Sequence, residues 1–257
     1  MENKFTINIK LVNIMQRSIT PEKIEKSTSG WEMFWNKASK LSYPIVWDCN
    51  PELASASDLP RFQNLMNPEL PLIDFACGNG TQTRFLANYF SRLIGVDISS
   101  SAIEVAKKQN AASNIEYRVL DGLQPEQAAI LHSEIGDTNI YMRTGFHHIL
   151  KESRPDVARS LEILLGNTGT LYLIEFGENA LIFFKELLEK LDKPPQELSM
   201  VLEHELKPGT VTIEDIIQFF PNFDIVLSGE DTLGTIMKFP NGEYVRVPGI
   251  YAVLKRK

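Results

Sequence analysis

Cysteine is scarce in this chain of 257 residues, since Cys49 and Cys77 are the only two. Two cysteines are too few for a disulfide framework, and neither has the spacing of a zinc ligand. Long apolar runs are missing too: none reaches the length of a transmembrane helix, and residues 1–18 lack the continuous apolar core of a signal peptide. These absences predict a cytoplasmic protein that neither enters a membrane nor depends on a metal.

Basic residues are in the minority. The chain carries 26 Lys and Arg against 33 Asp and Glu, and its net charge of −7 corresponds to a pI near 5.3. An acidic chain repels phosphate backbones, and the only basic cluster is the terminal run 255–257. Nucleic acid is therefore not an expected partner, and a small-molecule substrate is favoured. The length suits one α/β domain with an added cap.

The amino-terminal part differs in texture from the rest. Residues 1–70 hold all three tryptophans and no run typical of a buried strand. Thr20 followed by Pro21 indicates the start of a helix, because threonine caps helices and proline suits their first turn. Helical spacing continues to Trp31 and Trp35, and a second short helix is predicted at 59–65.

From residue 71 onward, strands and helices alternate. Helices are predicted at 83–90, 100–109, 125–134 and 155–165. Short apolar runs predict strands at 72–75, 93–96, 115–120, 139–143 and 171–176. Because such crossovers are right-handed, this order predicts an α/β fold with a mainly parallel sheet and helices on both faces.

The end of the chain departs from this alternation. Helices at 180–191 and 213–220 precede strands at 224–227 and 250–254. Between those two strands lies the tight-turn pair Asn241-Gly242, but no helical pattern. A parallel pair needs a crossover, so the last two strands are predicted to be antiparallel.

The most informative stretch is DFACGNG at 74–80, which follows a strand and precedes a helix. Ala76, Gly78 and Gly80 alternate there, so the backbone can turn tightly and a ligand can lie almost against it. Asp97 ends the next strand, where a carboxylate reaches ribose hydroxyls in Rossmann-like units. Asp121 ends the third strand and can accept a hydrogen bond from an adenine amine.

Either aspartate alone could be a helix cap or a loop residue, but all three features in order indicate a nucleoside cofactor. A dinucleotide fingerprint needs a third glycine where this chain has Thr83. A nicotinamide-dependent reductase is therefore a minor alternative.

On these motifs, residues 71–177 resemble class I S-adenosylmethionine-dependent methyltransferases, and the resemblance continues more loosely to residue 257. Ala76 replaces the first glycine of that family's acid-x-Gly-x-Gly-x-Gly loop. The resemblance implies a Rossmann-like seven-stranded sheet with an antiparallel last strand. It also implies a helical lid formed by 1–70 and a core at 71–257 with a helical insertion at about 178–221.

The implied cofactor is S-adenosyl-L-methionine, and its product is S-adenosyl-L-homocysteine. In such a site the glycine loop contacts the methionine part, Asp97 the ribose and Asp121 the adenine. The residues expected to bind the cofactor are Asp74, Ala76, Cys77, Gly78, Gly80, Asp97, Ile98, Asp121, Gly122 and Arg143.

A base is expected where strands four and five end. His147 and His148 follow the fourth strand, and the ordinary pKa of histidine suits proton removal near neutral pH. Glu175 ends the fifth strand and could orient an imidazole. We therefore predict a catalytic His–Glu pair, with His148 slightly preferred. The alternative is that one histidine caps a helix and Glu175 bonds to backbone.

We assign substrate recognition to aromatic residues. The alternative is that at least two of them only pack in the core. The predicted substrate-binding residues are Trp31, Trp35, Tyr43 and Phe146, and Trp47 is a further candidate. Residues 242–254 loosely resemble the ends of oxygen methyltransferases of polyketide and peptide biosynthesis. This favours a hydroxyl or carboxyl oxygen on a natural-product intermediate, free or held on a carrier protein, and a monomeric or homodimeric enzyme. Open alternatives are a nitrogen or carbon acceptor, or a non-catalytic S-adenosylmethionine-binding partner protein.

Overall fold

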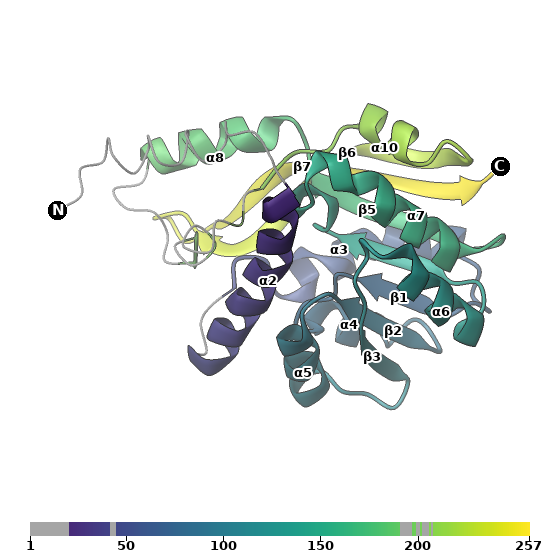
Figure 1. Ribbon diagram of the computed structural model, residues 1–257. Coiled ribbons are helices and arrows are strands. Elements are labelled where there is room, and N and C mark those ends of the chain that lie inside the picture. Colours follow the sequence, from purple (N-terminus) through teal and green to yellow (C-terminus); the bar gives the residue numbers. More distant parts are fainter. Residues whose placement is uncertain (1–20, 42–44, 191–196, 199–200, 202–205, 207) are drawn as a thin grey trace.

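One twisted sheet runs through the molecule, with helices on both of its faces (Figure 1). The structure is a computed structural model that describes residues 21–41, 45–190, 197–198, 201, 206 and 208–257. Its strands lie in the order β3-β2-β1-β4-β5-β7-β6. The strands are β1 (Leu72–Phe75), β2 (Leu93–Asp97), β3 (Ile115–Val119), β4 (Asn139–Arg143), β5 (Thr170–Phe176), β6 (Phe223–Lys238) and β7 (Tyr244–Arg256).

The directions of the strands confirm the predicted sheet. Each neighbouring pair from β3 to β5 is parallel, whereas β7 runs antiparallel to both β5 and β6. Strand β1 is wholly buried and pairs with β2 on one side and β4 on the other. The strand order reverses there, and in open α/β sheets ligands bind outside the carboxyl ends of the strands at such a switch point.

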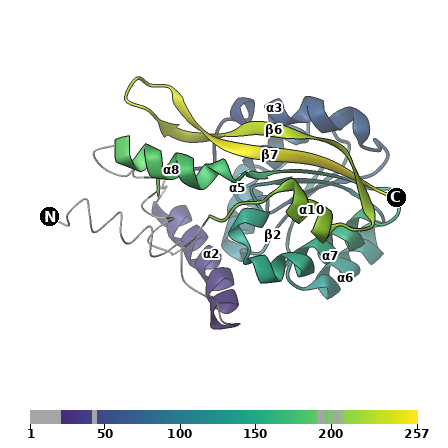
Figure 2. The same ribbon diagram turned by 90° about the horizontal axis from the view of Figure 1, so that it is seen from above.

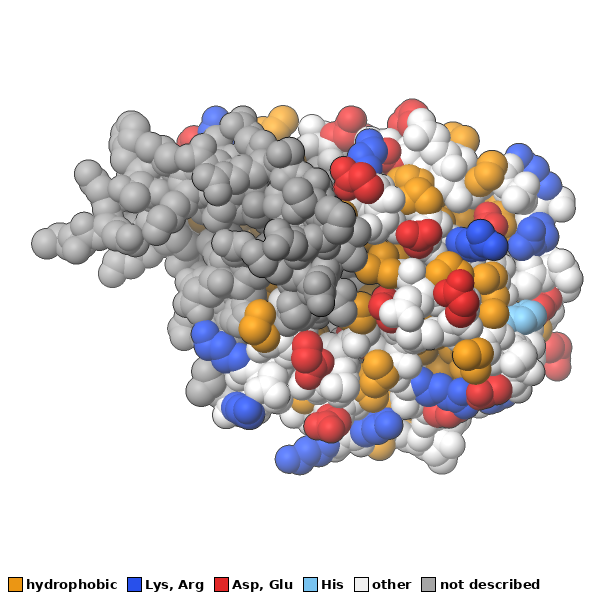
Figure 3. Space-filling view, in the orientation of Figure 1, with side chains coloured by type: hydrophobic (Ala, Val, Ile, Leu, Met, Phe, Trp, Pro, Cys, Tyr) orange, Lys and Arg blue, Asp and Glu red, His pale blue; other side chains and the backbone are white. Residues whose placement is uncertain are grey.

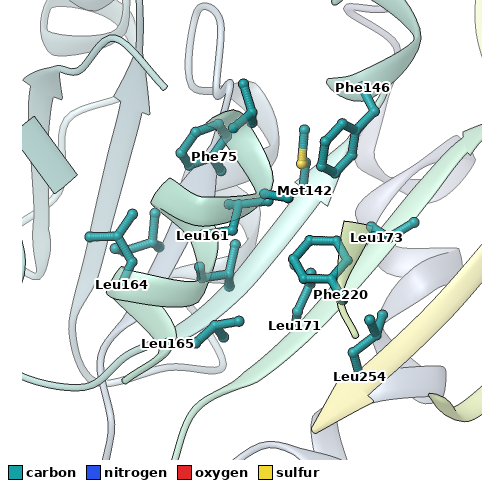
Figure 4. Packing of buried hydrophobic residues seen from close by; sticks show 14 of the residues in the cluster. Phe75, Met142, Phe146, Leu161, Leu164, Leu165, Leu171, Leu173, Phe220 and Leu254 are labelled. Carbon is teal, nitrogen blue, oxygen red and sulfur yellow. The ribbon is translucent and has the colours of Figure 1, made fainter. Parts of the chain in front are cut away.

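Two groups of helices cover the two faces. On one face, Phe62 and Leu86 pack against Tyr141 and Tyr172 of the central strands. The helices on this side are α3 (Ser55–Phe62), α4 (Thr81–Leu86) and α5 (Ser100–Gln109). The other face carries α6 (Pro125–Ile135), α7 (Arg154–Leu165) and α10 (Ile213–Phe219), which enclose the largest core cluster (Figure 4).

Helices α2 (Pro21–Leu41) and α8 (Asn179–Lys190) lie beyond the carboxyl ends of the parallel strands. Phe34 and Trp35 of α2 share a buried cluster with Leu187 of α8 and with Met237 and Val245 of the last two strands. The β6–β7 hairpin reaches out beside α8 (Figure 2). Helix α2 begins at Pro21, as the sequence predicts, and the division of the chain at residue 70 stays a prediction.

The last two strands are much longer than the sequence indicates. Strands were expected only at 224–227 and 250–254. Instead, β6 and β7 pair from Phe223 and Arg256 to Lys238 and Tyr244, with shifts of register at 225–227 and 234–238. Their outer parts are partly exposed and polar, so they lack the apolar runs by which buried strands are recognised. The first crossover helix was also overestimated: 83–90 was expected, but α4 ends at Leu86.

The described surface mixes charges of both signs. On the face shown in Figure 3, Lys and Arg side chains lie among Asp and Glu side chains. Among the described residues, no helix is both long enough and apolar enough to cross a membrane.

Candidate active site

The loop after β1 has an unusual backbone. Ala76, Gly78 and Gly80 take φ angles of 63°, 55° and 80°, all in the left-handed region. A Cβ on Gly78 would lie 2.9 Å from the Trp35 ring, and one on Gly80 would lie 2.5 Å from the Tyr117 hydroxyl. Both positions therefore require glycine for space as well as for conformation. Ala76, which stands where the resembled family has glycine, keeps the glycine-like conformation.

Asp74 at the centre of β1 holds the helix that follows this loop. Its Oδ2 accepts a hydrogen bond of 2.5 Å from Thr83 Oγ1 of α4. The side chain is 3% exposed, and this burial raises the pKa of Asp74 to about 7. The hydrogen bond from the Thr83 hydroxyl lowers the pKa of Asp74, but by less than burial raises it. Asp74 thus anchors α4 while it also lines the cavity described below.

Asp97 connects two loops at the end of β2. Its two oxygens accept backbone hydrogen bonds of 2.9 Å each, one from Gly78 and one from Ser99. Burial raises the pKa of Asp97 to about 6, against the lowering effect of these N–H donors. Each carboxylate oxygen has a second lone pair, so Asp97 can still accept hydrogen bonds from ligand hydroxyls.

Asp121 follows β3 and shapes the next loop. Its oxygens accept hydrogen bonds of 2.9 Å from the backbone of Leu123 and 2.7 Å from the side chain of Gln124. These bonds match the loop role that was the alternative for this residue. They leave acceptor capacity at the cavity wall, which Asp121 also lines.

These residues surround one cavity of about 170 Å³ at the carboxyl ends of β1 to β4. Nine of the ten predicted cofactor residues line it, and Gly80 alone does not. The nine are Asp74, Ala76, Cys77, Gly78, Asp97, Ile98, Asp121, Gly122 and Arg143. A tight glycine turn, a ribose acceptor and an adenine acceptor along one wall fit S-adenosylmethionine.

A buried ion pair holds Arg143, which lines this cavity together with Tyr141. Arg143 Nη1 donates to Asp58 Oδ2 over 2.7 Å, and the Tyr141 hydroxyl donates to the same oxygen over 2.8 Å. Burial by itself lowers the pKa of Arg143, but the charge of Asp58 more than reverses this, so the guanidinium stays charged. Sequence reasoning missed Asp58 because it lies on α3, in the segment assigned to the lid.

The predicted His–Glu pair is present, but it is made by His147 and not by the preferred His148. His147 Nδ1 lies 2.8 Å from Glu175 Oε2. Glu175 also accepts backbone hydrogen bonds from Gly145, Phe146 and His147. Both predictions for Glu175 therefore hold together: it binds the backbone and it orients an imidazole.

The electrostatics of this pair follow from its burial. Glu175 is 0% exposed, and burial raises its pKa to about 7 although three N–H groups favour the charged form. Burial, together with the charge of Arg154, lowers the pKa of His147 to about 3. The imidazole is therefore neutral, and its pKa lies well below the near-neutral value that the sequence argument for a base assumed. When Nδ1–H donates to Glu175, the lone pair of Nε2 is the proton acceptor, and Nε2 has no partner among the described residues.

His148 faces the aromatic residues of the lid. Its ring makes edge contacts with Trp31 at 4.7 Å and lies 5.8 Å from Trp47, measured between ring centroids. Burial, followed by the neighbouring His147, lowers the pKa of His148 well below its ordinary value. Its Nδ1 has no partner within the described part of the chain. His148 lines the large cavity, which His147 does not.

The predicted substrate residues separate into three groups. Trp31 and Trp35 line the large cavity together with Trp47. The prediction for Phe146 is wrong, because this ring is 0% exposed and packs against Met142, Phe219 and Phe220 in the main core (Figure 4). Tyr43 lies outside the described residues.

A second, smaller cavity of about 50 Å³ adjoins the first. Trp47, Arg143, Thr144 and His148 line both cavities, so the two share a wall. His147 lines the second cavity only. Thr144 stands at this junction with a φ of 60°, a strained value for a β-branched residue and typical of a functional loop.

Several cavity residues carried no signal in the sequence. Asp48 accepts a hydrogen bond of 2.6 Å from Asn79, and Gln82 donates to the Cys49 carbonyl over 2.9 Å. These bonds fix the segment after α2 against the glycine loop. The position of Asn79 and Gln82 beside that loop was a possible clue, whereas nothing in the sequence marked Asp48. Among the described residues, no group of three His, Cys, Asp or Glu side chains is placed to hold a metal.

Known methyltransferases share this fold. A family described as "Methyltransferase domain" matches residues 72–169. The chain is 55% identical to the solved SAM-dependent methyltransferase from Anabaena variabilis ATCC 29413, with a TM-score of 0.88 over 90% of this chain and 95% of that one. The solved DhpI–SAH complex, at 13% identity, has a TM-score of 0.54 over 91% of this chain and 96% of that one, and shows the shared fold.

Among curated proteins, the chain is similar to juvenile hormone acid O-methyltransferase of Bombyx mori. The identity is 27% over 126 residues, which are 48% of this chain and 44% of that enzyme. The match thus spans less than half of the curated relative.

The fold and the site define a class I methyltransferase with a Rossmann-like sheet. This chain belongs to the family of S-adenosylmethionine-dependent methyltransferases, and S-adenosylmethionine is its cofactor.

Proposed function

We propose that this enzyme methylates a hydroxyl oxygen of a small molecule and that His147, oriented by Glu175, is the general base. The observations that carry the proposal are the buried contact of 2.8 Å between His147 Nδ1 and Glu175 Oε2 and the place of His147 in the lining of the second cavity. A hydroxyl must lose its proton as it is methylated, and this arrangement supplies a proton acceptor.

The residues divide the work by position. When bound, S-adenosylmethionine would supply a methyl group on a positively charged sulfur for transfer to the acceptor oxygen. His147 Nε2 takes the hydroxyl proton, and ionised Glu175 stabilises the imidazolium that results. Trp31, Trp35 and Trp47 keep water from the cavity they line. Asp97 and Asp121 hold the ribose and adenine parts.

The curated relative supports oxygen as the acceptor atom, since its name identifies it as an O-methyltransferase. The identity is 27% over less than half of that enzyme. We include in the proposal that the acceptor is a natural-product intermediate, either free or held on a carrier protein. A carboxylate acceptor has no proton to lose, so it would not need His147. The same holds for a neutral amine during methyl transfer itself.

The test compares His147→Gln and Glu175→Gln with wild type, using labelled S-adenosylmethionine and a panel of hydroxyl acceptors. General-base catalysis contributes roughly 10² to 10⁴ in rate, so both variants should lose that much kcat at an unchanged S-adenosylhomocysteine Kd. His132→Gln, on helix α6, is the matched control and should keep full activity.

The pH profile gives an independent readout. Because the folded pKa of Glu175 is about 7, the ionised form that supports His147 is lost as pH falls below 7. The wild-type kcat should therefore fall tenfold per unit below that point. In Glu175→Gln, the dependence of kcat on pH near pH 7 should disappear. Full activity of His147→Gln on a hydroxyl acceptor would refute the role of His147.

A further inference from the structure

The second cavity is apolar except at one end. Five of its lining residues carry polar side chains, and Arg143 is the only charged one among the described residues that line it. Its apolar side chains come from the segment between α2 and α3, from β5, from α8, from β6, and from the region between α8 and α10. They are Val46, Trp47, Phe176, Phe184, Leu198, Val201, Pro208 and Leu233.

Most of the polar groups are already engaged. The Arg143 guanidinium is paired with Asp58. The Thr235 hydroxyl donates to the Val245 carbonyl, and the Thr144 hydroxyl donates to the Arg143 carbonyl. The two imidazoles differ, because His147 Nε2 and His148 Nδ1 are buried without a partner in the described part of the chain. The unpaired polar atoms of the described lining residues therefore gather at one end of the cavity.

That end is also where the two cavities meet. His148, Arg143 and Thr144 line both, and the ring centroids of His147 and His148 lie 3.9 Å apart. A molecule that fills the second cavity must present its polar end to these histidines, beside the cofactor cavity. A charged or sugar-like body would lose its hydration against apolar walls that cannot replace it.

We propose that the second cavity binds the body of the acceptor and selects an apolar ring or hydrocarbon chain that carries one hydroxyl at its end. Phe184 is a specificity-determining residue of this cavity. It lies on α8 and packs edge-on against Phe176, at a centroid distance of 5.5 Å, and Phe176 in turn stacks on His147 at 4.1 Å. The position assigned to the hydroxyl rests on the proposed function. The preference for an apolar body rests only on the residues that line the cavity.

The experiment measures binding directly. Naphthol, an apolar phenol, and dopamine, a catechol with a charged amine, are titrated by calorimetry into the S-adenosylhomocysteine-saturated protein. Naphthol should bind and dopamine should not. Phe184→Asp places a carboxylate on the apolar wall and should weaken naphthol binding by about tenfold or more. Phe184→Ala keeps the wall apolar and should admit a larger, tricyclic phenol that wild type excludes.

Ile182→Asp is the matched control, because it makes the same change on the same helix at a side chain that is 59% exposed and lines neither cavity. It should leave naphthol binding unchanged. An unchanged S-adenosylhomocysteine Kd in every variant shows that the fold is intact.

The outcomes separate the two proposals. Naphthol binding that depends on Phe184, without methyl transfer to any oxygen, supports the cavity assignment and refutes the proposed function. Methylation of a charged catechol with equal efficiency in wild type and Phe184→Asp supports the proposed function and refutes the cavity assignment. Failure of naphthol to bind more tightly than dopamine overturns the cavity assignment.

Discussion

Asp74 and Asp97 are buried carboxyl groups at the centre of the site, with pKa values of about 7 and about 6. Each is held by hydrogen-bond donors that stabilise its charged form, yet burial has the larger effect. A carboxyl group in this condition stabilises the folded protein when protonated and destabilises it when ionised. Individual residues of the site thus make stability depend on pH.

The variant Asp74→Asn tests this at the residue scale. The folded pKa of Asp74 lies above its ordinary 3.8, so its contribution to stability is present at low pH and is lost as pH rises towards 7. The asparagine does not ionise and still offers an oxygen to Thr83. The unfolding free energy of Asp74→Asn minus that of wild type should therefore increase from pH 5 to pH 8, by at most about 3 kcal/mol. Urea unfolding at both pH values measures the difference.

Asp137→Asn is the control for this measurement. Burial of Asp137 is slight, and hydrogen bonds, led by that from His132, outweigh it and lower its pKa to about 2. The stabilising effect of ionised Asp137 is lost only as pH falls towards 2. The decrease in unfolding free energy caused by Asp137→Asn should therefore be the same at pH 5 and pH 8. A pH-independent difference for Asp74→Asn would show that Asp74 is ionised throughout.

At the scale of elements, one side chain ties the lid helix to the cofactor site. Glu32 of α2 accepts hydrogen bonds from the Ser99 hydroxyl at 2.7 Å and from the Ser101 hydroxyl at 2.5 Å, with further bonds from Ser100 and the Ser101 backbone. Burial opposes ionisation of Glu32, but these donors prevail and lower its pKa. Ser99 also donates its backbone N–H to Asp97, so one residue contacts both helix α2 and the carboxylate that is predicted to bind the ribose.

Glu32→Ala should therefore weaken cofactor binding although Glu32 does not line the cavity. Without the acceptor at the start of α5, the Trp31 and Trp35 side chains lose their fixed position over the cavity. We expect the S-adenosylhomocysteine dissociation rate to rise by roughly tenfold, since hydrogen bonds to a charged group contribute about 1.5–3 kcal/mol. Stopped-flow tryptophan fluorescence measures this rate.

Met33→Ala is the matched substitution on the same helix, at a side chain that is 56% exposed. It should leave the dissociation rate unchanged. Equal rates in Glu32→Ala and wild type would mean that α2 is held by its apolar contacts alone.

At the scale of the whole molecule, the cofactor cavity joins the loops after four strands to the lid helix. A ligand that binds only this assembled state must stabilise the entire fold. S-adenosylhomocysteine at a hundredfold excess over its Kd should add about 2.7 kcal/mol to the unfolding free energy and raise Tm. Asp97→Ala should lose most of this shift. NAD should cause none, and an equal shift with NAD would contradict the cofactor assignment.

The order of the elements, and the position of the predicted cofactor loops at one edge of the sheet, could be read from the sequence. Asp97 and Asp121 could be placed near the glycine loop because the carboxyl ends of parallel strands meet at one edge of a sheet. The antiparallel ending was also predictable, since no crossover helix separates the last two strands. These are local patterns combined with a rule of chain connection.

The tertiary structure alone decided which side chains meet. Phe146, His147 and His148 form a 3₁₀ turn, in which successive side chains point about 120° apart. One therefore enters the core, one meets Glu175 and one faces the lid, and no periodicity in the sequence says which. The pairing of Asp58 with Arg143 spans 85 positions of the chain. Such contacts depend on how helices settle on the sheet, which only the packed structure fixes.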